Sequence, residues 1–351
     1  MKLLLTGGCG FIGSAVIRHL IRHTGHSVVN VDKMTYAASE EALEEALHHD
    51  RHLLVKADIA DPAAMRQVFD THDPDAVMHL AAESHVDRSI DGPGEFVRTN
   101  VTGTFTLLEA TRRHYEQLSP SRKQTFRFHH VSTDEVFGAL DNGDPPFTET
   151  TPYDPRSPYS ATKAASDHLV RAWHHTYHLP TMVSNTCNNY GPWQFPEKLI
   201  PLVTLNALAG KELPVYGDGS NIRDWIFVDD HAGALVTVIE NGEPGETYAI
   251  GGRQPRSNLE VVKAICAHLD RRVPDPAGPR ERMIRFVTDR PGHDFRYEID
   301  PTATENKIGW KAAHDFETGL GLTIDWYLNN RSWWEGVQTA RYAGQRLGTA
   351  A

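Results

Sequence analysis

The sequence contains little cysteine, no block of basic residues and no apolar run that approaches the length of a membrane span. Its three cysteines, Cys9, Cys187 and Cys266, are too scattered for a disulfide framework or a Cys-x-x-Cys metal site. A formal charge of −11 argues against nucleic acid or an anionic membrane as the main partner. The first five residues lead directly into a glycine-rich turn, so no N-terminal signal is apparent. We therefore expect a cytoplasmic protein.

Short apolar runs alternate with helical stretches in the first part of the chain. The 351 residues, 40% of them hydrophobic and 23% charged, are typical of a globular protein with one large or two modest domains. We predict strands at 2–6, 27–31, 53–56, 76–80, 126–131 and 181–185. We predict helices between them at 14–22, 40–47, 62–69, 93–115 and 157–177. This alternation predicts an α/β fold with a doubly wound, Rossmann-type parallel sheet.

The texture of the chain changes after Asn188, where proline and glycine become frequent. Helices are expected there at 196–209, 229–240, 258–269 and 316–328. We predict a first domain over 1–188 and a smaller α/β ligand-binding lobe over 189–330, some segments of which return to the first domain. A tail follows over 331–351, in which we expect Trp333 and Trp334 to pack. The cleft between two such lobes is where ligands usually bind.

Three glycines, Gly7, Gly10 and Gly13, follow the first predicted strand and open a helix. This is the context that a dinucleotide fingerprint requires, because the helix N-terminus then faces the phosphates. The spacing is Gly-x-x-Gly-x-x-Gly, and an ordinary structural turn is the alternative. Asp32, at the end of the second strand, favours the fingerprint, since a carboxylate there accepts hydrogen bonds from ribose hydroxyls and repels a 2′-phosphate. Lys33 is the counter-argument for a phosphorylated ribose, but Asp32 leads us to expect NAD.

Tyr159 and Lys163 lie one helical turn apart and therefore point the same way. An ammonium at that spacing favours the phenolate and can also hold a nicotinamide ribose, which would make Tyr159 a usable base near neutral pH. An isolated Tyr-x-x-x-Lys is common by chance. Here it follows a nucleotide fingerprint and begins a helix at the right point of a doubly wound order, so we interpret it as catalytic.

Thr133, Asp134 and Glu135 come just after an apolar run, where a strand would end. Two carboxyl groups in different environments can serve as acid and base, one of them kept protonated by burial. The alternative is a helix N-cap followed by an acidic first turn. The residues alone leave both interpretations open.

The 20 histidines form no metal-binding pattern that we recognise. His174 and His178 are four residues apart on a predicted helix, but no acidic third ligand accompanies them. We interpret the pair as a solvated helix face and expect no metal ion. Cys9 could have a lowered pKa near a helix N-terminus, but we take it as a small residue in a tight turn.

Taken together, these motifs resemble the dTDP-glucose 4,6-dehydratases, of the extended short-chain dehydrogenase/reductase superfamily. The resemblance runs from residue 1 to about 330. It rests on the stretches 6–14, 80–89, 132–136, 159–163, 188–192, 195–201, 222–225 and 289–294. The glycine and Tyr-Lys motifs mark the superfamily, the Thr-Asp-Glu triplet distinguishes dehydratases from epimerases, and the last stretch points to this family.

The resemblance implies NAD in the first domain and a sugar nucleotide, dTDP-glucose, in the second lobe. The residues it assigns to NAD are Gly7, Gly10, Phe11, Ile12, Gly13, Asp32, Lys33, Thr35, Asp58, Ile59, Leu80, Ala82, Thr99, Tyr159, Lys163 and Asn189. The residues it assigns to the substrate are Ser84, Thr133, Asn188, Lys198, Leu199, Pro214, Tyr216, Arg223, Asn258, Arg290 and His293. From the residues alone, Asp58 and Ile59 read equally well as an ordinary turn, and either arginine as a structural salt bridge.

The resemblance also implies a redox-neutral reaction and a role for each catalytic residue. Tyr159, supported by Lys163, takes the proton of the sugar 4-hydroxyl while hydride leaves C4, and Thr133 hydrogen-bonds the same oxygen. Glu135 removes the C5 proton, Asp134 helps the 6-hydroxyl leave as water, and hydride returns to C6. It further implies a homodimer packed through helices 93–115 and 157–177. Phe137 stands where the family usually has tyrosine, and we expect this to tune the site.

Three rival functions are weighed against this one. A sugar-nucleotide 4-epimerase shares NAD, Tyr and Lys but needs no acid–base pair for elimination. A dehydratase of a UDP- or GDP-sugar is the stronger competitor, because recognition of the base rests on few contacts. A non-catalytic NAD-binding protein would not need all five catalytic residues.

Overall fold

Seven parallel strands form the central sheet, in the order β11-β6-β5-β4-β1-β2-β3. The computed structural model describes residues 1–289 and 292–340. The strands are β1 (Lys2–Thr6), β2 (Ser27–Asp32), β3 (His52–Lys56), β4 (Ala76–His79), β5 (Arg127–Thr133), β6 (Thr181–Thr186) and β11 (Thr247–Ile250). The strand order reverses between β1 and β4, and ligands bind at such switch points in doubly wound sheets. The predicted fold class is confirmed.

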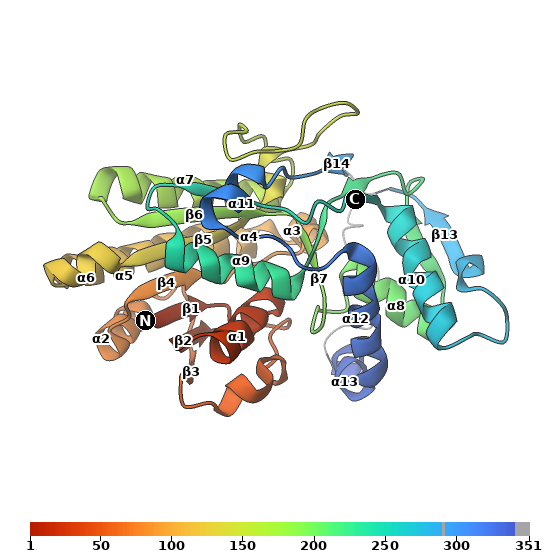
Figure 1. The fold of residues 1–351 in the computed structure, drawn as a ribbon, viewed down its shortest axis with the longest axis horizontal. Coiled ribbons are helices and arrows are strands. Elements are labelled where there is room, and N and C mark those ends of the chain that lie inside the picture. Colours follow the sequence, from red (N-terminus) through yellow and green to blue (C-terminus); the bar gives the residue numbers. More distant parts are fainter. Residues whose placement is uncertain (290–291, 341–351) are drawn as a thin grey trace.

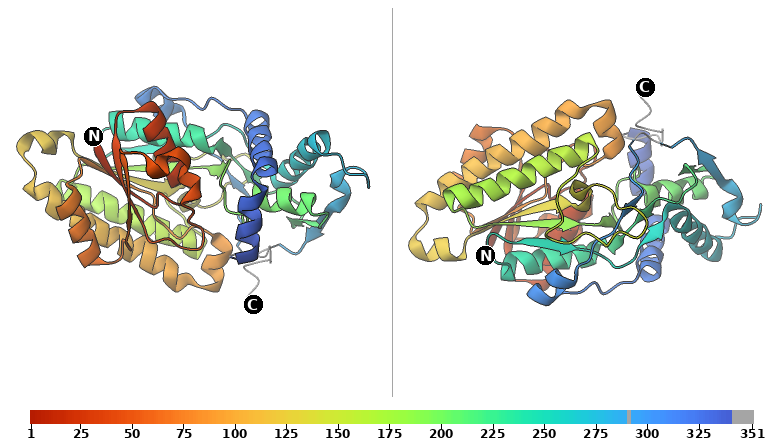
Figure 2. Two further views of the ribbon diagram at one scale, coloured as in Figure 1. Left: turned by 90° about the horizontal axis from the view of Figure 1, so that it is seen from below. Right: turned by 90° about the horizontal axis from the view of Figure 1, so that it is seen from above.

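Helices cover both faces of this sheet (Figure 2). On one face α1 (Phe11–His23) packs against α9 (Val228–Asn241), and on the other α5 (Thr104–Gln117) packs between α2 (Pro62–His72) and α7 (Pro158–Tyr177). Apolar side chains from each helical layer and from the strands form a separate hydrophobic cluster on each face. Because parallel strands are buried on both sides, nearly every residue of β1, β2 and β4 is apolar or hydrogen-bonded.

The helix predicted over 93–115 is present, but a wider turn interrupts it. It consists of α4 (Pro93–Phe96), a π-helical segment over Val97–Gly103, and α5. Asn100, within the π-helical segment, exchanges hydrogen bonds with the Glu83 backbone and donates to Thr162 Oγ1 at 2.9 Å. The π-helical segment therefore links the loop after β4 to α7. The apolar periodicity of the sequence does not predict this segment.

A second lobe packs beside the carboxyl ends of the strands, around its own hydrophobic core (Figure 1). Its strand pairs are β7 (Asn188–Tyr190) with β10 (Trp225–Phe227), β8 (Leu213–Tyr216) with β13 (Ile284–Val287), and β9 (Ile222–Arg223) with β12 (Arg256–Ser257) and β14 (Arg296–Tyr297). Its helices are α8 (Leu199–Leu208), α10 (Asn258–Arg272) and α12 (Phe316–Asn329). Residues 228–250, which form α9 and β11, lie with the sheet and not with this lobe.

Shorter helices complete the described chain. They are Glu41–His48, α3 (Val86–Asp91), α6 (Pro120–Thr125), Asp134–Phe137, Arg280–Met283, α11 (Thr302–Ile308) and α13 (Arg331–Ala340). In α13, the Trp333 ring packs against Trp193 and Trp326, as the expected packing role requires. None of the helices in residues 1–289 and 292–340 combines the length and the apolar character that a membrane crossing needs.

Candidate active site

The glycine loop connects β1 to α1 in a turn that excludes larger side chains. Gly7 has φ +76°, and its amide donates to the Val31 carbonyl at 2.9 Å. A Cβ on Gly13 would lie 2.1 Å from the Gly7 carbonyl oxygen, and a Cβ on Gly7 would lie 2.8 Å from the Ala81 backbone. The loop is therefore closed tightly enough for a phosphate to approach backbone amides at the N-terminus of α1.

Asp32 ends β2 and turns its carboxylate toward this loop. Oδ2 accepts from the Cys9 amide at 2.9 Å and Oδ1 from the Met34 amide at 2.8 Å. Burial raises the pKa of Asp32, and these two hydrogen bonds oppose the rise. The neighbouring Lys33 Nζ binds Glu95 Oε1 at 3.0 Å, so its charge is already paired, which removes the argument for a phosphorylated ribose.

One cavity runs from the glycine loop to the start of α7. The predicted cofactor residues that line it are Gly7, Gly10, Phe11, Ile12, Gly13, Asp32, Lys33, Thr35, Ile59, Leu80, Ala82, Thr99, Tyr159 and Lys163. Sequence reasoning missed other lining residues, namely Tyr36, Ala37, Ala38, Ala57, Glu83, Ser132, Gln194, Phe195 and Glu197. Most come from loops after the strands, and Ser132 comes from the end of β5. Glu83, Ser132, Phe195 and Glu197 lie within stretches that carry the family resemblance, but they were not assigned to the cofactor.

Two predicted cofactor residues lie outside the described lining of this cavity. Asp58 faces an adjoining surface hollow, where its carboxylate binds Arg98 at 2.8 Å. Asn189 lies on β7 and donates to the Cys187 carbonyl, while its own carbonyl accepts from Gln194 at 2.9 Å. Asn189 thus touches the cavity through Gln194.

The end of β5 carries the acidic pair in a short helical turn. Thr133 caps this turn, because its hydroxyl accepts from the Glu135 amide at 3.2 Å and donates to Asp134 Oδ1 at 3.3 Å. Both interpretations left open by the sequence therefore hold: the triplet is a cap with an acidic first turn, and it also presents two carboxyls in different environments. Burial, followed by the charge of Glu135, raises the pKa of Asp134 well above its usual range. Asp134 therefore holds its proton to higher pH than an ordinary carboxyl group.

Tyr159 and Lys163 are buried in the first turns of α7, whose start is fixed by a capping box between Ser157 and Ser160. Lys163 Nζ donates to the Val131 carbonyl at 2.9 Å, and burial lowers its pKa to about 8. Burial and the charge of Glu135 raise the pKa of Tyr159. Burial thus acts against the phenolate that the Tyr-Lys spacing favours, and the role of Tyr159 as a base stays a prediction.

The predicted substrate residues fall into two groups. Ser84 and Lys198 line the main cavity, and Lys198 Nζ donates to the Ser84 carbonyl at 2.9 Å. In the second lobe the rings of Tyr216 and His293 meet edge to face, 6.1 Å apart. Asn188 is on β7, Leu199 begins α8, Pro214 is on β8 and Asn258 begins α10. Arg290 lies outside the described residues.

Arg223 joins the second lobe to the acidic pair. Its guanidinium lies 4.1 Å from the ring centroid of Tyr297 and donates to the Asp294 carbonyl at 3.0 Å. Its positive charge opposes the rise in the pKa of Asp134, and the charge of Glu135 contributes, after burial, to raising the pKa of Tyr297. Tyr297, which sequence reasoning missed, therefore lies within electrostatic reach of Glu135.

The residues of the cavity fit a dinucleotide. The glycine loop has no space for side chains where a pyrophosphate would approach, and the Asp32 carboxylate faces the cavity beside it. Outside the lining of this cavity, on β7, the buried amide oxygens Asn188 Oδ1 and Asn189 Oδ1 have no hydrogen-bond partner among the described residues. Phe137, by contrast, points away from polar partners and packs against Phe147 and Tyr153.

Comparison with known proteins agrees with this geometry. The family model described as GDP-mannose 4,6 dehydratase matches residues 4–323. The chain is 56% identical over 359 residues to a dTDP-glucose 4,6-dehydratase of Escherichia coli, and 57% identical over 351 residues to one of Neisseria meningitidis; each match covers 99% of both chains.

Solved structures show the same similarity. The dTDP-glucose 4,6-dehydratase DesIV of Streptomyces venezuelae, crystallised with NAD, superposes with a TM-score of 0.88 at 40% identity, covering 96% of this chain and 100% of the other. A UDP-glucose 4-epimerase of Thermotoga maritima superposes with a TM-score of 0.83 at 27% identity, covering 94% and 100%. The chain thus resembles dehydratases more closely than this epimerase.

Proposed function

We propose which groups perform the activity of this chain. The chain belongs to the dTDP-glucose 4,6-dehydratase family, and its activity is the NAD-dependent dehydration of dTDP-glucose. Five groups between β5 and α7 perform it. They are Thr133, Asp134, Glu135, Tyr159 and Lys163. The observation that carries this assignment is the buried Asp134, whose pKa is raised, directly beside Glu135, because an elimination needs one acid and one base close together. A bound NAD supplies a hydride acceptor for the sugar C4 and, after water is lost, a hydride donor for C6.

The oxidation at C4 falls to the groups on α7 and at the end of β5. Tyr159 takes the proton of the 4-hydroxyl, and Thr133 donates a hydrogen bond to the same oxygen. Lys163, fixed by the Val131 carbonyl, keeps its remaining N–H groups for a ribose hydroxyl. Tyr159 acts as the phenolate, formed by loss of its proton to solvent, and this phenolate is a strong base because burial raises the pKa of the phenol.

The loss of water falls to the carboxyl pair. Oxidation at C4 acidifies the proton at C5, which Glu135 removes. Asp134, whose pKa burial raises, donates its proton to the departing 6-hydroxyl. The two carboxyls differ because Asp134 is completely buried whereas Glu135 is partly exposed.

The second lobe would bind the nucleotide diphosphate. Arg223 carries a planar guanidinium, suited to bidentate phosphate contact, and Tyr216 and His293 form an aromatic corner in the same lobe. The matched family model is named for a GDP-sugar enzyme, whereas relatives above 55% identity are named for dTDP-glucose. The names of these relatives support dTDP-glucose over another nucleotide sugar as the substrate. The acid–base pair supports dehydration over 4-epimerisation as the reaction.

We further propose a homodimer in the cytoplasm. Val97, Phe105 and Tyr177 are 45–50% exposed, and all three lie on the helical segments predicted to form the dimer interface. Large apolar side chains grouped on one surface favour association. All three cysteines are buried and unpaired, which suits a reducing compartment.

The test of function is incubation of the protein with dTDP-glucose without added NAD, followed by the alkaline absorbance of the 4-keto-6-deoxy product. Turnover of UDP-glucose but not dTDP-glucose, even with NAD supplied, would overturn the substrate assignment. Glu135→Gln should abolish exchange of the C5 proton with solvent, whereas Asp134→Asn should slow water loss more than oxidation. Wild-type rates in either variant would refute the role given to that residue.

A further inference from the structure

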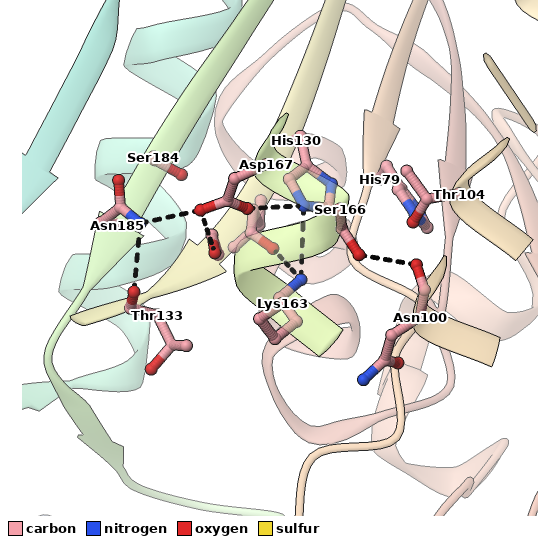
Figure 3. Close-up of polar contacts among 12 residues, drawn as sticks. His79, Asn100, Thr104, His130, Thr133, Lys163, Ser166, Asp167, Ser184 and Asn185 are labelled. Carbon is pink, nitrogen blue, oxygen red and sulfur yellow. Dashed lines mark hydrogen bonds and ion pairs between the residues drawn. The ribbon is translucent and has the colours of Figure 1, made fainter. Parts of the chain in front are cut away.

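Behind the catalytic lysine lies a group of buried polar residues that no motif singled out. Asp167 is one helical turn beyond Lys163 on α7 and is 0% exposed, and His130, on β5, is 1% exposed. His130 Nε2 lies 3.1 Å from Asp167 Oδ1 and 3.5 Å from Lys163 Nζ (Figure 3). A carboxyl group this deeply buried is costly unless its charge is used and satisfied.

Asp167 accepts three hydrogen bonds on one of its two oxygens. Oδ2 accepts from Ser132 Oγ at 2.9 Å, from Tyr153 OH at 2.8 Å and from Asn185 Nδ2 at 3.2 Å. The same Asn185 amide donates to the Thr133 carbonyl at 3.1 Å. Asp167 therefore connects the helix that carries Tyr159 and Lys163 to the strand end that carries Thr133.

We propose that Asp167 is a positioning residue for this reaction: it is the buried counter-charge that keeps Lys163 an ammonium and ties its helix to the catalytic end of β5. This inference rests on the proposed role of Lys163. The remaining groups that face Lys163 cannot supply a negative charge, since His130 on β5 and His79 on β4 are imidazoles and Tyr159 is a phenol. Among the described residues, Asp167 is the carboxylate whose charge acts on Lys163.

The titration behaviour of these groups agrees with that geometry. Although burial opposes it, the contact with His130 and the charge of Lys163 lower the pKa of Asp167. Burial, followed by the charge of Lys163, lowers the pKa of His130 to about 4, so its ring is neutral at neutral pH. The buried unit thus contains one anion and one cation with a neutral imidazole between them.

The experiment is to replace Asp167 by asparagine, which keeps the shape and the hydrogen-bond acceptor but removes the charge. Lys163 Cε is followed by NMR against pH in ¹³C-lysine-labelled protein, with the signal assigned by its loss in Lys163→Met. We expect the midpoint of Lys163, about 8 in the unaltered protein, to fall by about one to three pH units, as loss of an adjacent opposite charge predicts. The alkaline limb of the pH profile for C4 oxidation should move down with it.

Tyr153→Phe is the matched control. It removes one hydrogen bond to Asp167 Oδ2 and leaves the carboxylate charge in place, so the Lys163 midpoint should stay at the wild-type value. A wild-type midpoint in folded Asp167→Asn, or an equal fall in both variants, would overturn the proposal.

A second measurement tests the proposal if the variant does not fold, and the titration is independent of the proposed function. If Asp167→Asn does not fold, the ¹³C shift of the Asp167 carboxyl in unaltered protein at pH 7 decides: an ionised group supports the proposal and a protonated one refutes it. The NMR titration uses no substrate. A protein that fails to convert dTDP-glucose but shows the expected fall in the Lys163 midpoint would therefore overturn the proposed function and not this inference.

Discussion

The cofactor cavity and the second lobe assemble their ligand-binding residues in different ways. In the cavity, each group follows the carboxyl end of a parallel strand: Gly7 after β1, Asp32 at the end of β2 and Leu80 after β4. In the second lobe, Tyr216, Arg223 and His293 come from separate short segments that meet only through pairing of β8 with β13 and of β9 with β12 and β14. Strand direction builds the part of the first site around the glycine loop, whereas the second site depends throughout on long-range pairing.

The largest expected effect comes from a substitution that disrupts the cofactor cavity and leaves the second lobe unchanged. In Gly13→Ala the new Cβ would lie 2.1 Å from the Gly7 carbonyl oxygen, so the glycine loop must open. We expect a loss of NAD affinity of about 100-fold or more, measured by calorimetry, and a destabilisation of about 1–3 kcal/mol. Gly25→Ala is the control, because nothing lies within 4 Å of its added Cβ. Tight NAD binding in Gly13→Ala would contradict the assignment of the loop.

A smaller effect is expected from a change in the lobe alone. Arg223→Lys replaces a planar fork, stacked on Tyr297 and bonded to the Asp294 carbonyl, by a point charge that cannot do both. We expect the KM for dTDP-glucose to rise about tenfold, which corresponds to ~1.4 kcal/mol, while NAD content is unchanged. Arg285→Lys, at an exposed site on β13 of the same lobe, should leave KM unaltered. A fall in NAD content in Arg223→Lys would mean that the two sites are not separable.

The smallest expected effect is on the pH dependence of stability. It concerns Asp134 of the acidic pair, between the cofactor cavity and the second lobe. Burial raises the pKa of Asp134 above its usual 3.8, so the native state holds this proton in a pH range where the unfolded state has lost it. Stability should therefore fall as pH rises from 4 through the native pKa of Asp134. Asp134→Asn should flatten that slope in urea unfolding measured at several pH values. Asp50→Asn, at an exposed position, should keep the wild-type slope.

The cavity could be predicted from the sequence because its signals are local. Strand, glycine turn and helix follow one another within residues 2–23, and Lys163 follows Tyr159 by one turn of a helix. The missed residues have no local signal that points to a cofactor, although several lie in stretches that carry the family resemblance. Glu197 and Phe195 reach the cavity from a loop more than 150 residues after Tyr36, and Tyr36 meets them through a hydrogen bond of 2.9 Å to Glu197 and an edge-to-face ring contact with Phe195.

Two expectations show where local reasoning reaches its limit. The ammonium of Lys163 was expected to lower the pKa of Tyr159, but that depends on how deeply both groups are buried, and the pKa is raised instead. The helix over 93–115 was correctly placed, yet its π-helical segment exists because Asn100 must reach both Glu83 and Thr162. Burial and cross-element hydrogen bonds are properties of the packed molecule.

The sequence by itself determined the doubly wound sheet, the glycine loop with Asp32, and the presence of a Tyr-Lys pair beside Thr133, Asp134 and Glu135. Each of these depends on residues close together along the chain, so propensity and spacing are sufficient to define them. Only the tertiary structure decided that burial raises the pKa of Asp134, that Arg223 lies over Tyr297, and that Asp167 meets His130, Ser132 and Asn185 in the core. Those properties depend on desolvation and on contacts between segments far apart in the sequence, which exist only in the packed molecule.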